Sequence, residues 1–217
     1  MLAKEKELMS GYRKQEQNYI ECGPNSMMYI RNPNPDRTWE AYLEDALSTE
    51  ALQYVEQYVK DNPTQPAGTS KHGDDQGIRK SDITWININE DAQKNLYGEV
   101  HQLVERVNQG KYNFQISSIE PIQYSEYTDG GHYTWHTDAT LKGEQNDTRK
   151  ISFSILLNDD FEGGELELYK FGDKPDTMKM KKNSILFFPS FILHRVTPVT
   201  SGTRKALVGW VHGPNFV

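Results

Sequence analysis

Residues 149–158 read RKISFSILLN, and every second position of this stretch is apolar, beginning with Ile151. Successive side chains of a strand point to opposite faces, so Ile151, Phe153, Ile155 and Leu157 would share one face. The spacing therefore predicts a strand with an apolar face that packs against a core.

The chain from about Asn113 onward continues in short segments of the same kind. GGELELYKF (163–171) alternates leucine with glutamate, while NSILFFPSFILHRVTPV (183–199) and TRKALVGWVHG (203–213) are apolar stretches broken by proline and glycine. Many short strands separated by turn residues are typical of a jelly roll.

Three helices are expected before these strands. RTWEAYLEDAL (37–47) has apolar residues at helical spacing, and Ser48 suits the N-cap of a helix over 49–60. The stretch 90–110 carries one apolar stripe and has Gly110 at the position of a C-cap.

These patterns predict an α+β fold, mainly β, with N-terminal helices supporting a double-stranded β-helix (jelly roll). We expect a single domain over 1–217, in which 113–217 form the jelly-roll core and 1–30 are an extension.

Composition excludes several classes of protein. Hydrophobic residues make up 35% of the 217 residues and charged residues 25%, which argues against disorder. No apolar run reaches the ~18 residues of a membrane span, and the N-terminus lacks the apolar region of a secretory signal. The single cysteine, Cys22, fits a cytoplasmic location, and the net charge of -7 disfavours nucleic acid as a partner.

One short motif supplies candidate metal ligands. In GGHYTWHTDATLKG (130–143), His136 and Asp138 are two positions apart and would share a strand face. His194 lies in an apolar strand further on. Two imidazoles and one carboxylate on one side of a metal form the facial triad of non-haem Fe(II) oxygenases. The H-x-D tripeptide alone is a weak signal.

An arginine strengthens that interpretation. Arg204 follows His194 by ten positions and shares a strand face with Ala206, Val208 and Trp210. An arginine on an apolar face is costly unless paired, and its planar guanidinium suits bidentate capture of a carboxylate. We therefore expect an anionic ligand beside the metal.

HTD (136–138) together with FPSFILHRVTPVTSGTRKALVGW (188–210) resembles the Fe(II)/2-oxoglutarate-dependent dioxygenases, in their prolyl/lysyl-hydroxylase-like (prolyl 4-hydroxylase-type) branch. The resemblance runs from about Gly77 to the C-terminus and includes IRKSDITWI and FEGGELELY. It implies roles for six residues: iron ligation by His136, Asp138 and His194, and binding of 2-oxoglutarate by Arg204, Tyr127 and Trp210.

Other residues are less clearly placed by the resemblance. The family often has a polar group on the strand that carries Ser154 and Leu156 here, so the second anchor of the co-substrate is open. Tyr133 has the parity of neither ligand on an ideal strand, and it and Arg79 are expected only as substrate contacts. Specificity is expected in the loops 62–80 and 139–149.

The resemblance implies Fe(II), 2-oxoglutarate and O2 as cofactors, with ascorbate as a stimulant, and succinate and CO2 as co-products. The reaction would be hydroxylation, because related halogenases have a small residue in place of Asp138. The implied substrate is an amino-acid side chain of a peptide or protein, with proline first, or an amino-acid-like small molecule. The oligomeric state, monomer or homodimer, is open.

Two other functions remain as alternatives. One is a non-enzymatic jelly-roll binding module, and the other is a zinc-dependent hydrolase that uses the same His136, Asp138 and His194. Neither needs Arg204 ten positions after His194, and both predict no oxygen consumption.

Overall fold

The computed structural model describes residues 38–67, 77–139, 147–170 and 172–216. Its larger sheet has the strand order β1-β12-β8-β15-β6-β4-β2, and β5 pairs with β15. All of the pairings are antiparallel. The strands are β1 (Ala41–Leu43), β12 (Ser184–Pro189), β8 (Thr148–Leu156), β15 (Arg204–Gly213), β6 (Ile122–Tyr127), β4 (Asp82–Ile86), β2 (Gln65–Pro66) and β5 (Ser118–Ile119).

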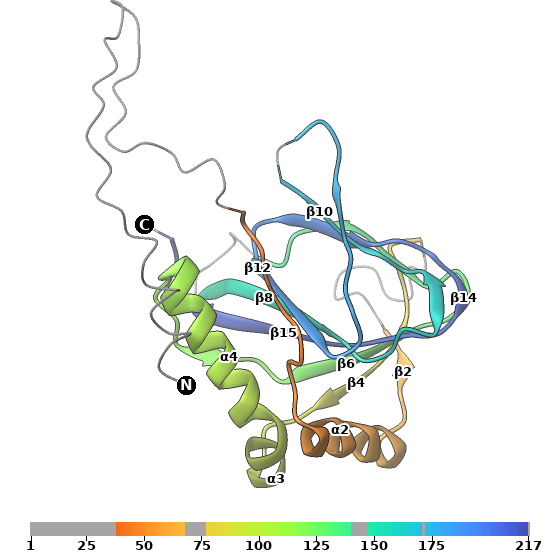
Figure 1. Ribbon diagram of the computed structural model, residues 1–217, viewed down its shortest axis with the longest axis horizontal. Helices are drawn as coiled ribbons and strands as arrows, with labels where there is room; N and C mark the ends of the chain where they lie inside the picture. The colour runs from red at the N-terminus through yellow and green to blue at the C-terminus, as the bar shows by residue number, and fades with distance from the viewer. Residues whose placement is uncertain (1–37, 68–76, 140–146, 171, 217) are drawn as a thin grey trace, which may run out of the picture. The chain divides into compact units, whose positions relative to one another are not determined.

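A smaller sheet faces the larger one (Figure 1). Its order is β11-β10-β13-β7-β3, and a separate ribbon pairs β14 with β9. The strands are β11 (Asp176–Met178), β10 (Leu166–Tyr169), β13 (Leu193–Val196), β7 (His132–His136), β3 (Arg79–Lys80), β14 (Val199–Gly202) and β9 (Phe161–Gly163). This arrangement confirms the predicted jelly roll.

The central strands β6, β8 and β12 of the larger sheet are buried on both faces. Its outer face carries Phe153, Phe187 and Leu207, which pack with the helices in one hydrophobic core. Its inner face carries Leu186 and Phe188, which pack with the smaller sheet in a second core. The inner face is where the candidate site lies.

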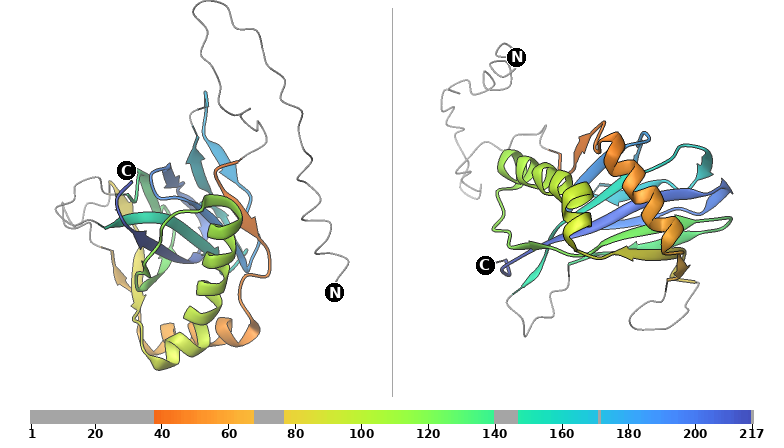
Figure 2. Two further views of the ribbon diagram at one scale, coloured as in Figure 1. Left: turned by 90° about the vertical axis from the view of Figure 1, so that its left-hand side faces the viewer. Right: turned by 90° about the horizontal axis from the view of Figure 1, so that it is seen from below.

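The helices cover the outer face of the larger sheet (Figures 1 and 2). Ser48 caps α2 (Thr49–Asp61) by accepting a hydrogen bond from the backbone N–H of Ala51, as predicted. The second covering segment runs through α3 (Glu90–Ala92), η1 (Gln93–Tyr97), α4 (Gly98–Val107) and η2 (Asn108–Tyr112). No helix among the described residues is both long and apolar enough to cross a membrane.

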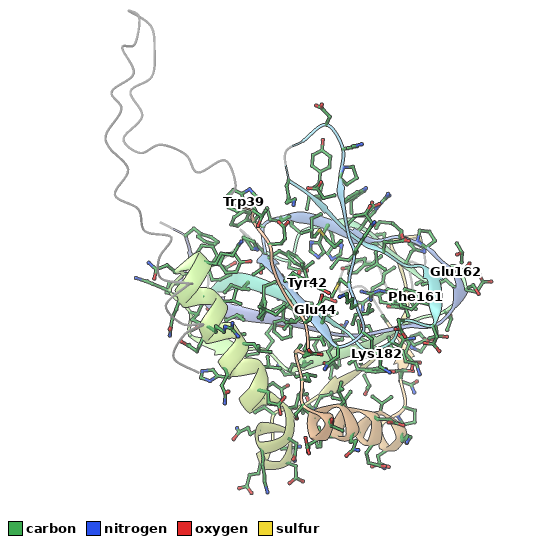
Figure 3. The ribbon with its side chains drawn as sticks, in the orientation of Figure 1. Trp39, Tyr42, Glu44, Phe161, Glu162 and Lys182 are labelled. Carbon is green, nitrogen blue, oxygen red and sulfur yellow. The ribbon has the colours of Figure 1, made fainter. Side chains whose placement is uncertain are left out.

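The helix predicted over 37–47 is wrong. Ala41 and Leu43 lie in β1, which pairs with β12 at the edge of the larger sheet. Figure 3 shows Trp39, Tyr42 and Glu44 spaced along this extended segment. Trp39 and Tyr42 are exposed rather than buried in a helical stripe. Pairing with the exposed edge of β12 overrides a local helical pattern.

The C-cap predicted at Gly110 is also wrong. The helix continues through Gly110 and ends at Asn113, which has the left-handed φ of 54°. Asparagine tolerates this conformation better than most residues. The side chain of Asn108 then closes the end by hydrogen bonding to both backbone groups of Phe114.

The described residues cover only part of the predicted domain. The extension over 1–30 and Cys22 lie outside the described residues. The extent of the domain remains a prediction.

Candidate active site

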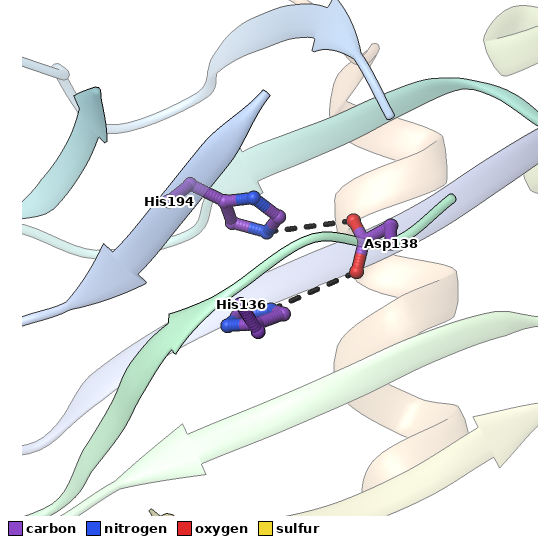
Figure 4. Close-up of side chains that lie close together, drawn as sticks. All are labelled: His136, Asp138 and His194. Atoms are coloured by element: carbon purple, nitrogen blue, oxygen red, sulfur yellow. Dashed lines mark ion pairs between the residues drawn. The ribbon is translucent and has the colours of Figure 1, made fainter. Parts of the chain in front are cut away.

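Three predicted ligand residues meet between the two sheets. His136 ends β7, and His194 lies directly across from it on β13. Asp138 follows two residues after His136, and one potential ligand atom from each of the three lies within 4.8 Å of the others. In Figure 4 both imidazoles turn toward the carboxylate, with 3.6 Å from His136 Nε2 to Oδ1 and 3.4 Å from His194 Nε2 to Oδ2.

Backbone carbonyls orient both imidazoles. Nδ1 of His136 lies 2.7 Å from the carbonyl of Thr134, and Nδ1 of His194 lies 2.9 Å from that of Ile192. A carbonyl can only accept, so each Nδ1 carries the proton. Each Nε2 therefore keeps its lone pair and presents it to the same point, which is what a metal ligand requires.

The electrostatics of the cluster suit a cation. Burial and the neighbouring His194 lower the pKa of His136 to about 4, so its imidazole is neutral at physiological pH. Burial raises the pKa of Asp138, but His194, His136 and Ser152 outweigh this and hold it below its ordinary value. Two imidazoles and an ionised carboxylate are a donor set that fits a divalent metal.

Arg204 lies on the inner face of β15 and is 2% exposed. Tyr127 is directly across from it on β6, and its ring centroid is 5.6 Å from the guanidinium carbon. Within the described residues Arg204 forms no ion pair. Burial lowers the pKa of its guanidinium, but arginine remains charged. A buried, unpaired cation fits an anionic ligand such as a carboxylate.

The glycine pair before β10 leaves room for this arginine. Gly164 has a φ of +65°, and a Cβ there would lie 3.1 Å from Cδ of Arg204 and 2.8 Å from a methyl of Val199. Only glycine combines that backbone conformation with that space. The second glycine of the GGELEL motif is therefore needed to make room for the side chain of Arg204.

Trp210 lies on the same inner face and is 7% exposed. The guanidinium of Arg149 is 4.0 Å from its ring centroid, and Trp85 lies beside it at 6.1 Å. Nε1 of Trp210 is buried, and the indole N–H is one of the groups that lower the pKa of the Asp138 carboxyl. Trp210 therefore lies beside the carboxylate of Asp138 and forms a wall of the candidate metal site.

Tyr133 lies closer to the cluster than strand parity indicated. The pairing of β13 with β7 shifts register between His194 and Val196, so that Val196 faces Tyr133. This bulge adds one residue to β7, which restores Tyr133 to the face of His136. Its ring stacks on the imidazole of His136 at 3.6 Å, and the guanidinium of Arg79 is 4.9 Å from the Tyr133 ring.

Two serines and a leucine lie on the inner face of the larger sheet near Arg204 and Trp210. Ser154 lies across from Val208, and Leu156 across from Ala206. Ser125 is buried on β6, where its hydroxyl accepts a hydrogen bond from Gln123. The second anchor of a co-substrate carboxylate is therefore not identified by Leu156 or Ser154 alone.

Sequence reasoning missed Ser152 and Ser190. The hydroxyl of Ser152 donates to Oδ2 of Asp138 at 2.7 Å, and Ser190 lies 2.9 Å from Ser152. A signal was present, because Ser152 has the parity opposite to Phe153 and so faces the interior. Nothing in the sequence indicated that Asp138 would lie opposite it.

Two further histidines lie elsewhere. His132 contacts the carbonyl of Gly130, and His212 lies between Glu120 and Asp147. Within the described residues, His136, Asp138 and His194 form the one group suited to a metal. Of the two predicted specificity loops, residues 68–76 and 140–146 lie outside the described residues.

Comparison with known families gives one match over this region. The sequence pattern of the 2OG-Fe(II) oxygenase superfamily matches residues 122–212. This segment contains all three residues of the cluster together with Arg204 and Trp210. The match confirms the resemblance that the motifs indicated.

Curated relatives match over part of their length. A PKHD-type hydroxylase of Crocosphaera subtropica is 40% identical over 100 residues, which cover 43% of each chain. Another, from a Synechococcus species, is 34% identical over 140 residues, or 58% of each chain. The aligned part of this chain thus spans 43% of the first of these relatives and 58% of the second.

Solved structures share the fold. A prolyl hydroxylase of Trichoplax adhaerens, solved with a hypoxia inducible factor peptide fragment, superposes with a TM-score of 0.66 at 24% identity, over 80% of this chain and 83% of that one. A Pseudomonas putida prolyl-4-hydroxylase gives 0.65 at 20% identity, over 82% and 93%. At this identity the likeness establishes the fold.

Proposed function

Residues 122–212 belong to the 2OG-Fe(II) oxygenase superfamily, and we propose that the chain is an Fe(II)- and 2-oxoglutarate-dependent dioxygenase that hydroxylates an unactivated C–H bond. The observation that carries the proposal is the His–Asp–His cluster beside a buried arginine without an ion-pair partner among the described residues. The PKHD-type hydroxylases among its relatives support the same reaction class.

Each residue has one role in this proposal. His136, Asp138 and His194 hold Fe(II), which when bound supplies the chemistry of oxygen activation. Arg204 binds the far carboxylate of 2-oxoglutarate, and Tyr127 and Trp210 line the space beside it. Three protein ligands would leave the other coordination positions of the metal to the reactants.

The reaction balances without a further reductant. One oxygen atom of O2 enters the C–H bond of the substrate as a hydroxyl, and the other enters succinate as 2-oxoglutarate loses CO2. The protein would orient the two organic reactants and limit the access of water to them. Ascorbate would stimulate turnover by reducing iron that has been oxidised without product.

We propose an amino-acid side chain of a peptide as substrate, with proline first, and an amino-acid-like small molecule as the other option. Tyr133 and Arg79 would contact this substrate. Tyr133 stacks on the imidazole of His136, and Arg79 lies over the ring of Tyr133. The prolyl hydroxylase of Trichoplax adhaerens, whose fold this chain shares, was solved with a peptide fragment.

The remaining parts of the proposal concern the whole chain. We also propose a single domain with an extension over 1–30, as a monomer or a homodimer. The single Cys22 supports a cytoplasmic location.

The first experiment uses anaerobic protein with Fe(II) and 2-oxoglutarate. A weak visible charge-transfer band is expected, and on admission of O2 it should bleach with formation of succinate. A protein that binds zinc, gives no such band and consumes no O2 would instead be a hydrolase. A protein that binds no metal would be a binding module.

A further inference from the structure

Two buried serines stand behind the carboxylate of Asp138. Ser152 lies on β8, and Ser190 follows β12; their exposed fractions are 1% and 0%. Ser152 Oγ is 2.7 Å from Asp138 Oδ2, and the two serine oxygens are 2.9 Å apart. The three side chains form a continuous chain of hydrogen bonds from Ser190 to the candidate metal ligand.

The direction of this chain follows from its last member. An ionised carboxylate can only accept, so the single hydroxyl proton of Ser152 goes to Asp138. The hydrogen bond between the two serines must then be donated by the hydroxyl of Ser190 and accepted by the oxygen of Ser152. Hydrogen bonds that point the same way strengthen one another, particularly out of contact with water.

Ser190 also holds the backbone of the ligand. Its carbonyl accepts hydrogen bonds from the N–H groups of Asp138 and Ala139, both at 2.9 Å, and its own N–H donates to Lys150 at 3.1 Å. The segment after β7, the start of β8 and the segment that leads to His194 are therefore joined at one residue. Asp138 is thereby restrained in both its main chain and its side chain.

From this geometry we propose that Ser152, supported by Ser190, is a positioning residue that makes Asp138 a one-oxygen ligand. Oδ2 faces His194 at 3.4 Å and Oδ1 faces His136 at 3.6 Å, and the hydroxyl of Ser152, bound to Oδ2, favours Oδ1 as the atom offered to the metal. A carboxylate that binds through one oxygen takes one coordination position and leaves more room for reactants. The inference rests on the proposed function, since it concerns the same metal site.

The test measures metal affinity rather than turnover. Co(II) is titrated into metal-free protein, and its visible absorption reports both occupancy and coordination. Ser152→Thr and Ser152→Val form a matched pair, because they have nearly the same shape and differ in the hydroxyl. Ser152→Ala and Ser190→Ala complete the set.

Ser184→Ala is the control for a merely structural role. Ser184 is as buried as Ser190, and its hydroxyl donates to the carbonyl of Lys181, away from the cluster. Its loss should lower the melting temperature of the metal-free protein and leave Co(II) affinity unchanged.

We expect Ser152→Val and Ser152→Ala to weaken Co(II) binding by about 10- to 100-fold, the usual effect of losing a partner of a metal ligand. Ser152→Thr should bind as the wild type does, and Ser190→Ala should lose less than Ser152→Ala. The Co(II) absorption of the Val and Ala variants should also change shape, because the freed carboxylate can bind through both oxygens.

Two failures are distinguishable. If wild-type protein binds neither Co(II) nor Fe(II), the proposed function falls. If the wild type binds metal and Ser152→Val binds it with the same affinity and the same spectrum, the positioning role is overturned and the proposed function stands.

Discussion

Arg204 shows at the scale of a residue how one side chain narrows the function. A guanidinium that is buried on an inner sheet face, without an acidic partner among the described residues, would be costly unless a ligand completes it. The zinc-hydrolase and binding-module alternatives give Arg204 no such ligand. Its position, together with the cluster, favours a dicarboxylate co-substrate.

Replacing Arg204 by alanine should raise the 2-oxoglutarate KM by about 10- to 100-fold, the loss of one charge-assisted contact. Co(II) affinity should stay close to that of the wild type, because Arg204 is not part of the metal cluster. Steady-state kinetics and Co(II) titration check the two parts, with Lys205→Ala on the opposite strand face as control. An unchanged KM would remove the carboxylate role.

Replacing Asp138 by alanine should abolish metal binding and hydroxylation while leaving the fold intact. The loss in Co(II) affinity should exceed the about 100-fold upper range seen when only a partner of a ligand is lost. Circular dichroism checks the fold. The control is His132→Ala, which removes a nearby histidine outside the cluster and should bind metal as the wild type does. Turnover by Asp138→Ala in the absence of added chloride would contradict the assignment.

The residues of the candidate site differ in how far sequence could predict them. His136, Asp138, His194 and Arg204 were named from spacing and motif, because a strand places alternate residues on one face. The strand face of Tyr133 does not follow from simple alternation, since a bulge changes that alternation and depends on the partner strand. Ser152 was overlooked because a hydrogen bond between distant segments leaves no local pattern.

At the scale of elements, the sequence predicts the segments whose local pattern agrees with their tertiary contacts. The strand around Phe153 and the helix after Ser48 have patterns that tertiary contacts reinforce. The segment 37–47 has a helical spacing of apolar residues, yet three of its residues complete the edge of the larger sheet. Only the presence of β12 decides between the two.

The packing of β8 against β15 predicts the effect of one methyl group. Gly209 lies across from Phe153, and a Cβ there would lie 2.7 Å from Cε1 of that ring. Gly209→Ala should therefore destabilise the fold by about 1–3 kcal/mol, through forced repacking of the core under the helices. Denaturant unfolding measures this change.

Gly110→Ala is the matched control for that prediction. Nothing lies within 4 Å of a Cβ at Gly110, which is in a helical segment. Alanine there should stabilise the fold by up to about 1 kcal/mol. Equal effects of the two substitutions would mean that Phe153 does not pack against Gly209 as described.

At the scale of the whole molecule, an ion cluster ties together segments far apart in the sequence. Glu120, before β6, pairs with Arg149 at 2.5 and 2.7 Å and also contacts His212 on β15. Arg149 in turn covers Trp210 at the inner face. The cluster therefore connects the stability of the larger sheet to the placement of one wall of the candidate site.

This cluster gives the fold an acid-sensitive component. Burial raises the pKa of Glu120, but hydrogen bonds from Arg149 and His212 outweigh it and hold the pKa below its ordinary 4.5. A carboxyl whose pKa is lower in the folded state stabilises the fold above its unfolded pKa, and this contribution is lost as pH falls through the folded value.

Glu120→Gln should thus be less stable than the wild type at neutral pH, and the difference should shrink below about pH 4.5. Denaturant unfolding from pH 3 to 7 measures it, with Glu162→Gln at an exposed position (Figure 3) as control. A difference that persists unchanged at pH 3 would show that Glu120 stabilises the fold by packing and not by its charge.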